Sequence, residues 1–363
     1  SLGVGEPDFK TPWAVREAGI ESLEHGRTRY TSNAGLKELR AEIARYLDRR
    51  MGLKYDPAKE VLVTVGGSEA IDMCIRALVQ PGDEVIIPEP CFVCYEPITQ
   101  LTGGVPVHIA TRAEDQFRLT ADQLRAAITP KTKLLIFPYP NNPTGAVMSA
   151  AEMEEIAAVL RETNVLVLSD EIYSELTYGL DRHVSIASLP GMAERTIVVN
   201  GFSKSYAMTG WRIGFAAAGR EIVQVMSNYL SHSLSGTCSI AQAAAEEAFG
   251  GSQAEIEAMR RAFEVRRDYL YQRMSAIPGV HPVRSEATFY MLMNLEELIG
   301  RTLYGGEIRD ADDFANVFLR EGLVAVVPCT GFGAPHYVRW SFAVSMENIK
   351  EGLDRLEKFL ANA

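Results

Sequence analysis

The chain has 363 residues, 47% of them hydrophobic and 23% charged, which is the ordinary composition of a folded protein of about two domains. A formal net charge of −11 disfavours nucleic acid or an anionic membrane as a partner, and no apolar run reaches the ~20 residues of a membrane span. The five cysteines are odd in number and scattered, which is not the pattern of a disulfide framework, so we expect a cytoplasmic location.

The first fifty residues predict an irregular start followed by two helices. Glycine and proline interrupt residues 1–13, where we expect a loop. Apolar residues at helical spacing predict helices over residues 14–25 and 36–50. Tyr30 lies between these helices, and its sequence context alone indicates a surface aromatic.

A strand, a glycine-rich turn and a helix then follow in immediate succession. Residues 60–65 are an apolar strand, and Gly66-Gly67-Ser68 separates it from a helix with one apolar face. Free N–H groups and the dipole at a helix N-terminus bind anions, so Gly67 and Ser68 are candidate phosphate ligands. The turn lacks the Walker A spacing and the GxGxxG pattern, which favours a single phosphate ester over a nucleotide.

Strands and helices continue to alternate through the middle of the chain. We expect strands at 83–87, 105–109 and 133–137 and a helix at 120–128. This alternation predicts a doubly wound, mostly parallel α/β sheet over residues 60–220. Asn142 lies in a turn of composition Asn-Asn-Pro-Thr-Gly, and Ser149 is placed to cap the next helix.

An acidic residue ends the clearest buried strand. Residues 164–170 are almost wholly apolar and stop at Asp170, at the strand end where open α/β sheets bind ligands. The carboxylate could cap the following turn, or it could keep a pyridine nitrogen protonated. Tyr173, three residues later, would face the same ligand.

Cys91 and Cys94 form a CxxC pair around Phe92. A zinc site would need a second such pair or two histidines, and the interior of the pair is not of the Gly-Pro-like redox type. We therefore expect a structural role for both cysteines and no metal site in the protein.

The stretch from residue 200 to Arg212 contains the strongest candidate nucleophile. Lys204 follows a buried strand at 196–199 and has small or hydroxylated neighbours, among them Ser203 and Ser205. A lysine that loses its hydration can release its proton and attack a carbonyl to form a Schiff base. The hydroxyls and Arg212 would hold an anion beside it. Taken alone, a lysine in such a loop is usually a surface charge.

The last hundred residues predict a smaller α+β domain. A long helix at 254–274 leads into strands at 288–293, 324–327 and 337–342, with helices at 311–320 and 346–361. Within the last of these strands lies Arg339, which is either part of a buried salt bridge or a ligand for a carboxylate. We expect the domain boundaries at 16–252 for the large domain and at 253–363, together with 1–15, for the small one.

Taken together and in this order, these motifs resemble the class I and II pyridoxal-phosphate-dependent aminotransferases of fold type I, with aspartate aminotransferase as the nearest pattern. The lysine segment from Ser203 to Gly214 carries the strongest similarity, which extends from Gly5 to the C-terminus. The resemblance implies a Schiff base between Lys204 and pyridoxal 5′-phosphate. It assigns further cofactor contacts to Gly67, Ser68, Phe92, Asn142, Asp170, Tyr173, Ser203 and Arg212, and substrate contacts to Gly5, Asn142 and Arg339. Relatives usually carry a further segment before the residue equivalent to Ser1.

The implied activity is transfer of an amino group from an L-amino acid to a 2-oxo acid by ping-pong kinetics. Lys204 would act as general base, and Asp170 and Tyr173 would assist at the cofactor ring. The resemblance also implies a homodimer, in which Tyr30 reaches the cofactor phosphate of the neighbouring subunit. A β-elimination lyase or a synthase of the same fold is the main alternative, and a ligand-sensing domain of a transcription regulator is a third.

Two departures from the family pattern concern the substrate pocket. Cys329 and Ala287 stand where close relatives usually have glycine, so the pocket size is expected to differ. The partner of the substrate side chain is not readable from the motifs. Candidates for that region are Arg27, Arg29, His232 and Ser233, although a surface role is the more common one for each.

Overall fold

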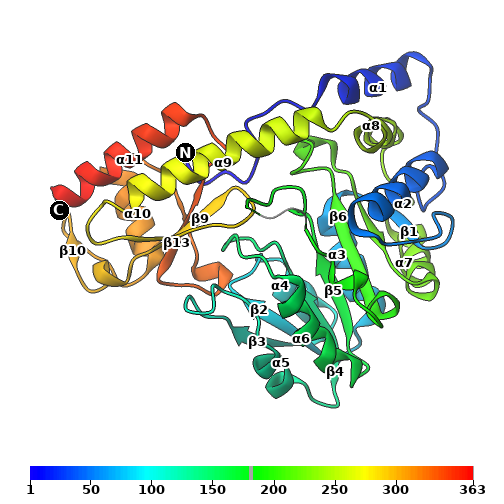
Figure 1. Ribbon diagram of the computed structural model, residues 1–363, viewed down its shortest axis with the longest axis horizontal. Helices are drawn as coiled ribbons and strands as arrows, with labels where there is room; N and C mark the ends of the chain where they lie inside the picture. Colours follow the sequence, from blue (N-terminus) through cyan, green and yellow to red (C-terminus); the bar gives the residue numbers. More distant parts are fainter. Residues whose placement is uncertain (180–182, 363) are drawn as a thin grey trace.

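Two β-sheets organise the molecule, as a computed structural model describes it for residues 1–179 and 183–362 (Figure 1). The larger sheet has seven strands in the order β1-β7-β6-β5-β4-β2-β3. Strand β7 runs antiparallel to both neighbours, and the other pairs are parallel. The bounds are β1 Val61–Thr64, β2 Glu84–Glu89, β3 Val105–Ala110, β4 Thr132–Phe137, β5 Leu166–Asp170, β6 Thr196–Gly201 and β7 Gly214–Ala217. The expected doubly wound, mostly parallel sheet is confirmed.

Helices cover both faces of this sheet. Their bounds are α1 Trp13–Glu24, α2 Lys37–Met51, α3 Gly66–Leu78, α4 Tyr95–Leu101, α5 Ala121–Ala127, α6 Ala150–Arg161, α7 Arg220–Ser233 and α8 Ser239–Gly250. Because successive strand residues point to opposite faces, the sheet contributes apolar side chains to the packing on each of its faces. Leu62 and Val199 pack with α3, α4 and α7 on one face. On the other face Val63 packs with α2 and α8, and Leu135 packs with α5 and α6.

The smaller sheet is antiparallel and has the strand order β12-β13-β9-β8. Phe263, Phe314 and Trp340 are central to the core that it shares with its helices. Figure 1 shows the long helix α9 running from the large sheet to the small one. The bounds are α9 Ala254–Met274, α10 Ala311–Glu321, α11 Met346–Ala361, β8 His281–Val283, β9 Tyr290–Asn294, β12 Val327–Pro328 and β13 Tyr337–Ser341, with a hairpin of β10 Thr302–Leu303 and β11 Gly306–Glu307.

The start of the chain pairs with the small sheet. The N–H of Leu2 donates to Ala325 O at 2.8 Å, and the N–H of Ser341 donates to Leu2 O at 2.6 Å. The side chain of Leu2 lies in the core of the small sheet. These contacts connect Leu2 to the small sheet, whereas Val15 packs in the core of the large one. The assignment of residues 1–15 to the small domain and the boundaries at 15/16 and 252/253 stay predictions.

One predicted strand is wrong over most of its length. Of the apolar run 324–327, only Val327 belongs to a strand. Leu323 has φ 55°, which turns the chain just before the run, and Ala325 uses its carbonyl to accept from Leu2. Val324 and Val326 are buried in the core nonetheless, so burial rather than strand pairing accounts for the apolar pattern.

Local capping chemistry begins helix α6 as predicted. The N–H of Ser149 donates to the Glu152 carboxylate at 2.7 Å, and the N–H of Glu152 donates to Ser149 Oγ at 3.3 Å. Of the helices in the described part of the chain, none combines the length and the apolar character that crossing a lipid bilayer requires.

Candidate active site

A cavity of about 270 Å³ opens at the carboxyl ends of β5 and β6, between the two sheets. Eleven of the twelve residues assigned to the site from the sequence line it. They are Gly67, Ser68, Phe92, Asn142, Asp170, Tyr173, Ser203, Lys204 and Arg212, with Gly5 and Arg339. The fold thus brings together residues that lie up to 334 positions apart, from both sheets and from the start of the chain.

Lys204 lies three residues beyond the end of β6, with its amine inside the cavity. Its Nζ donates to the carbonyl of Gly5 at 2.6 Å and lies 5.9 Å from the centre of the Phe289 ring. Burial lowers the pKa of Lys204 from 10.5 to about 8, and the positive charges of Arg212 and Arg339 add to this shift. The structure therefore holds an amine that releases its proton near neutral pH.

Asp170 is the last residue of β5 and is held from two sides. The hydroxyl of Tyr95 donates to its Oδ2 at 2.8 Å, and the N–H of Ile172 donates to Oδ1 at 3.2 Å. Burial raises the pKa of Asp170 to about 6, against the effect of these two hydrogen bonds. A positively charged group opposite Asp170 would favour the ionised carboxylate.

Two tyrosines meet at the side of the cavity near Gly5. The hydroxyl of Tyr173 donates to that of Tyr290 at 3.2 Å, and burial raises the pKa of both side chains. A Cβ at Gly5 would collide with the Tyr290 hydroxyl. The glycine is therefore required for the first residues of the chain to pass this close to the tyrosine pair.

The N-terminus of α3 and the Arg212 guanidinium form one end of the cavity. Arg212 has φ 55°, and its Nη1 donates to Thr209 O at 3.0 Å. A Cβ at Gly66 would lie 2.6 Å from Nη2 of Arg212, so only glycine lets the guanidinium rest on this helix end. Helix N–H groups, the hydroxyls of Ser68 and Ser203 and a guanidinium are the donor set that binds a phosphate.

Arg339 lies on β13, and its side chain lines the cavity. Its Nη1 donates to Asn142 Oδ1 at 2.8 Å, and its Nη2 donates to Gly3 O at 3.1 Å. The guanidinium carbon lies 4.0 Å from the centre of the Tyr290 ring and 5.2 Å from that of Phe332. No carboxylate among the described residues pairs with Arg339, which decides against the salt-bridge alternative.

Tyr30 is the assigned residue that the structure does not bring to the cavity. Its side chain is fully exposed on the segment between α1 and α2. The suggested pocket residues Arg27, Arg29, His232 and Ser233 are exposed too, and none of them lines the cavity. The hydroxyl of Ser205, which the sequence suggested as an anion ligand, does not line the cavity. It is buried, and no group among the described residues forms a hydrogen bond with it.

Both departures from the family glycines lie outside the cavity lining. Cys329 and Ala287 are fully buried in the protein interior. Their effect on the pocket can therefore only be indirect, through the packing of Phe332 and the 285–290 segment.

Tyr95 and Tyr290 are the contacts that sequence reasoning missed. Tyr95 begins α4, three residues after Phe92, and Tyr290 begins β9. A weak signal existed for Tyr95, because a tyrosine in the first turn after the Phe92 segment faces the same strand ends. Tyr290 gave no such signal, since its position depends on how the two sheets pack.

The CxxC pair has the structural character expected from the sequence. All five cysteines are free thiols, and burial raises the pKa of Cys91 and of Cys94. A raised pKa keeps both sulfurs in the unreactive thiol form at neutral pH.

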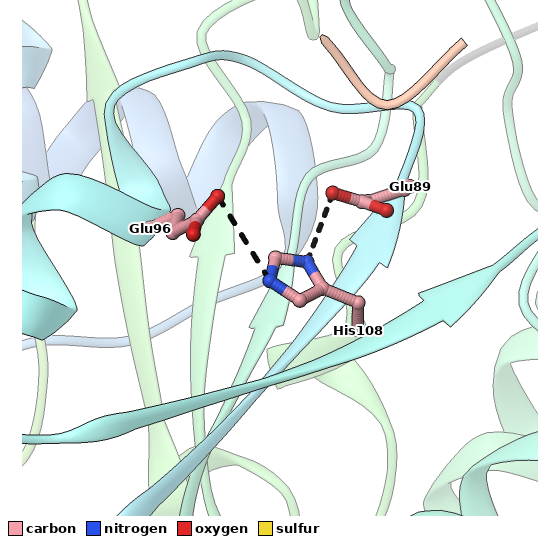
Figure 2. Close-up of side chains that lie close together, drawn as sticks. All are labelled: Glu89, Glu96 and His108. Atoms are coloured by element: carbon pink, nitrogen blue, oxygen red, sulfur yellow. Dashed lines mark ion pairs between the residues drawn. The ribbon is translucent and has the colours of Figure 1, made fainter. Parts of the chain in front are cut away.

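Within the described residues, one cluster contains enough potential metal ligands to be considered. Figure 2 shows the imidazole of His108, on β3, between the carboxylates of Glu89 and Glu96. Nδ1 lies 2.9 Å from Glu89 Oε1, and Nε2 lies 3.9 Å from Glu96 Oε2. Because the carboxylates face different ring nitrogens, their lone pairs do not converge on one point as a metal site requires. The cluster is an electrostatic bridge between β2, β3 and α4, and our expectation of no metal stays a prediction.

Comparison with known proteins shows which family the chain belongs to. The model of the family described as aminotransferase class I and II matches residues 1–356. The chain belongs to the class I and II aminotransferases. The protein is therefore an enzyme that transfers amino groups, and it has fold type I. Its cofactor is pyridoxal 5′-phosphate.

Individual aminotransferases match along almost the whole chain. A putative aminotransferase of Bacillus subtilis is 45% identical over 362 residues, covering 99% of this chain and 91% of that protein. The aspartate aminotransferase of Geobacillus stearothermophilus is 42% identical over 360 residues, with coverages of 99% and 90%. The crystal structure of the aspartate aminotransferase from Rhizobium meliloti has a TM-score of 0.96 at 38% identity, covering 99% of this chain and 91% of that chain. The aromatic aminotransferase from Pyrococcus horikoshii has a TM-score of 0.93 at 40% identity, with coverages of 99% and 95%.

The donor chemistry of the cavity of this aminotransferase fits its cofactor. An anion-binding helix end faces Arg212, an amine of lowered pKa lies in the cavity, and a buried carboxylate lies at the end of β5. Groups of these kinds suit a phosphate, an aldehyde and a ring nitrogen, all of which pyridoxal phosphate carries. The glycine at position 66 leaves the space that the guanidinium fills.

A pH profile of chemical labelling will test the lowered pKa of Lys204. At pH 7 a lysine with a pKa of about 8 is unprotonated in roughly one molecule in ten, against about one in a thousand or fewer for an ordinary lysine. We expect reductive methylation of the cofactor-free protein by formaldehyde to modify Lys204 with a midpoint near pH 8. Mass spectrometry of the peptides measures this, and the exposed Lys59 in the same sample is the control. A midpoint for Lys204 equal to that of Lys59 would contradict the burial effect.

Proposed function

We propose that this aminotransferase moves an amino group from an L-amino acid to a 2-oxo acid, with Lys204 as the residue that binds the cofactor and carries the proton. The observation that carries the proposal is the position of Lys204. Its amine is buried, has a pKa of about 8 and shares one cavity with Asp170 and Arg339. A reactive amine, a carboxylate and a carboxylate-binding guanidinium together are the groups that amino-acid chemistry on pyridoxal phosphate needs.

Residues at one end of the cavity hold the cofactor. Gly67, Ser68, Ser203 and Arg212 would bind its phosphate through helix N–H groups, hydroxyls and a guanidinium. Phe92 would cover one face of the ring. When bound, pyridoxal phosphate supplies the aldehyde that condenses with amines and a ring that withdraws electrons from the substrate carbon.

Residues along the cavity wall control protons at the ring. Asp170, oriented by Tyr95 and by the N–H of Ile172, would keep the proton on the ring nitrogen. Asn142 and Tyr173 would donate hydrogen bonds to the ring oxygen. Hydrogen bonds of this kind are stronger where water is excluded, and the side chain of Tyr173 is buried.

Arg339 and Lys204 act on the amino acid itself. Arg339 would bind the α-carboxylate with its two terminal nitrogens, in exchange for its present bonds to Asn142 and to Gly3 O. Gly5 would lie beside the same carboxylate. Lys204 Nζ would remove the proton from the α-carbon as a general base, which its lowered pKa allows near neutral pH. Release of the oxo acid before the second substrate binds gives ping-pong kinetics.

An absorbance titration tests this function directly. We expect the purified protein with cofactor to show a visible band that borohydride removes. One amino acid, added without any oxo acid, should convert the band to a near-ultraviolet form and release one equivalent of oxo acid. A β-elimination lyase would instead keep the visible band while pyruvate and ammonia accumulate. That outcome would replace our proposal with the lyase alternative.

We further propose a homodimer in which Tyr30 completes the phosphate site of the neighbouring subunit. The exposed side chain of Tyr30 and the exposed apolar side chains Trp13, Ile20 and Leu23 of α1 support an interface on this side. We expect sedimentation to show a dimer, and Tyr30→Phe to weaken cofactor binding by about tenfold through loss of one hydrogen bond to a phosphate. A fully active monomer would contradict this prediction. The cytoplasmic location remains our expectation from the odd number and the scattered positions of the cysteines.

A further inference from the structure

Behind Asp170 lies a buried polar cluster that the proposed chemistry does not use. Glu171 follows Asp170 directly and, because neighbouring residues of an extended chain point to opposite sides, its side chain points away from the cavity. The Glu171 carboxylate is fully buried and accepts three hydrogen bonds, from Ser169 Oγ at 3.0 Å, from Ser185 Oγ at 2.5 Å and from His183 Nε2 at 2.9 Å. We call these four residues the Glu171 cluster.

The main chain of Glu171 connects the cluster to the elements that carry the active site. Its N–H donates to Val199 O at 2.8 Å, which extends the pairing of β5 with β6 beyond Asp170. Its carbonyl accepts from the N–H of Ser174 at 2.9 Å and closes the turn that holds Tyr173. The hydroxyl of Ser174 in turn accepts from Asn200 Nδ2 at 2.9 Å, four residues before Lys204.

The charge of Glu171 lies close enough to act on Asp170. After burial, the negative charge of Glu171 is a further cause that raises the pKa of Asp170. A second negative charge behind Asp170 strengthens its attraction for any proton or cation in front of it. The other titratable groups that face Glu171 in the described structure are His183, which donates to it, and Tyr55.

A fully buried carboxylate is costly unless hydrogen-bond donors surround it. The three donors meet the hydrogen-bonding need of the Glu171 carboxylate. Two of them are neutral hydroxyls, which orient the carboxylate without cancelling its charge. An arrangement of this kind preserves a negative potential inside the protein.

We propose that Glu171, held by His183, Ser169 and Ser185, is a positioning residue that strengthens the hold of Asp170 on the proton of the cofactor ring nitrogen. The inference rests on the role proposed for Asp170 above. Glu171 touches neither cofactor nor substrate and acts through Asp170, by its charge and by fixing the end of β5.

The decisive variant is Glu171→Gln, which keeps the shape and an acceptor oxygen but removes the charge. Wild type and variant are reconstituted with pyridoxal phosphate carrying ¹⁵N in the ring, and the ¹⁵N chemical shift is followed against pH. We expect the pH at which the ring nitrogen loses its proton to fall by about one unit in the variant, a tenfold change in the proton's binding constant. We expect the dissociation constant of the cofactor to rise by a similar factor.

Glu175→Gln is the matched control. Glu175 lies in the next turn of chain, and its carboxylate accepts from Tyr46 Oη at 2.7 Å and pairs with Arg50. It lines no part of the cavity and is not among the groups that shift the pKa of Asp170. Its loss should lower the unfolding temperature without moving the ring-nitrogen signal. If Glu175→Gln lowered the pH at which the ring nitrogen loses its proton as much as Glu171→Gln does, general destabilisation would explain both results. That outcome would overturn the inference.

Variants at His183 keep the test decisive if Glu171→Gln does not fold. His183→Gln retains an amide donor and should leave the ring-nitrogen profile unchanged. His183→Phe removes the donor and should move the profile in the same direction as Glu171→Gln, by a smaller amount. Identical profiles for both His183 variants and wild type would overturn the inference.

Asp170→Asn separates this inference from the proposed function. If the ring nitrogen keeps its proton in Asp170→Asn, Asp170 does not have the role that the proposed function gives it, and that part of the proposed function is wrong. If Asp170→Asn loses the proton while Glu171→Gln matches wild type, only the inference fails, and the Glu171 cluster is purely structural.

Discussion

Lys204→Ala should lower the rate of amino-group transfer by about 10⁴-fold or more, because it removes the nucleophile and the general base together. The first half-reaction, measured in a single turnover with one amino acid, reports this loss directly. The fold should survive, since the Lys204 side chain makes a single hydrogen bond, to Gly5 O. Removal of a buried cation near Arg212 and Arg339 should leave the unfolding temperature unchanged or raise it.

Lys204→Arg is the matched control for charge. Arginine keeps the positive charge and the bulk but does not release its proton in proteins. We expect it to be as inactive as Lys204→Ala, whereas a small primary amine in the buffer should restore part of the activity of Lys204→Ala alone. A retained rate of more than a few per cent in either variant would show that another group moves the proton.

Arg339→Ala should have the second-largest effect, with kcat/KM for amino acids falling about 10²- to 10³-fold. The variant leaves the α-carboxylate in a buried cavity without its guanidinium partner, so the loss should fall mainly on KM. Arg339→Lys should recover little, because a point charge does not replace the two-pronged guanidinium contact. Steady-state kinetics with several donors measure both variants.

Two controls assign this loss to the substrate carboxylate. A primary amine without a carboxylate should react equally slowly with wild type and Arg339→Ala. Arg118→Ala removes a structural arginine that pairs with Glu152 and Glu286, and it should lower stability while leaving KM unchanged. If Arg118→Ala raised KM as much as Arg339→Ala, general loosening would explain both results.

Site residues that lie at or just after the end of a strand could be predicted from the sequence. Asp170 ends an apolar strand and Lys204 follows another, and parallel strands bring their carboxyl ends to one edge of the sheet. The glycine-rich turn before α3 could be assigned for the same reason, since its chemistry is local. The long helix at 254–274 was predicted to the residue because it is rich in alanine, glutamate and arginine, which favour a helix, and contains no glycine or proline.

Contacts that depend on the packing of distant elements were not predictable. Tyr290 meets Tyr173 only because the small sheet lies against the end of the large one. Gly3 contributes a backbone carbonyl to Arg339, and a backbone group leaves no mark in residue type. The burial of Glu171 contradicts the usual exposure of its residue type, and only the three donors around it make that position favourable.

The carbonyls of Gly3 and Gly5 make the start of the chain an internal competitor of the substrate. They occupy the guanidinium of Arg339 and the amine of Lys204, so the substrate carboxylate and the cofactor must each displace a bond that the protein already makes to itself. The measured affinity of any donor is then a difference between two sets of contacts. Whatever fixes residues 1–9 in place, such as the pairing of Leu2 with the small sheet or the salt bridge of Asp8 with Arg266, sets the strength of that competition. Substitutions at these remote contacts would therefore change the affinity for all donors by a common factor and leave the preference among donors as it was.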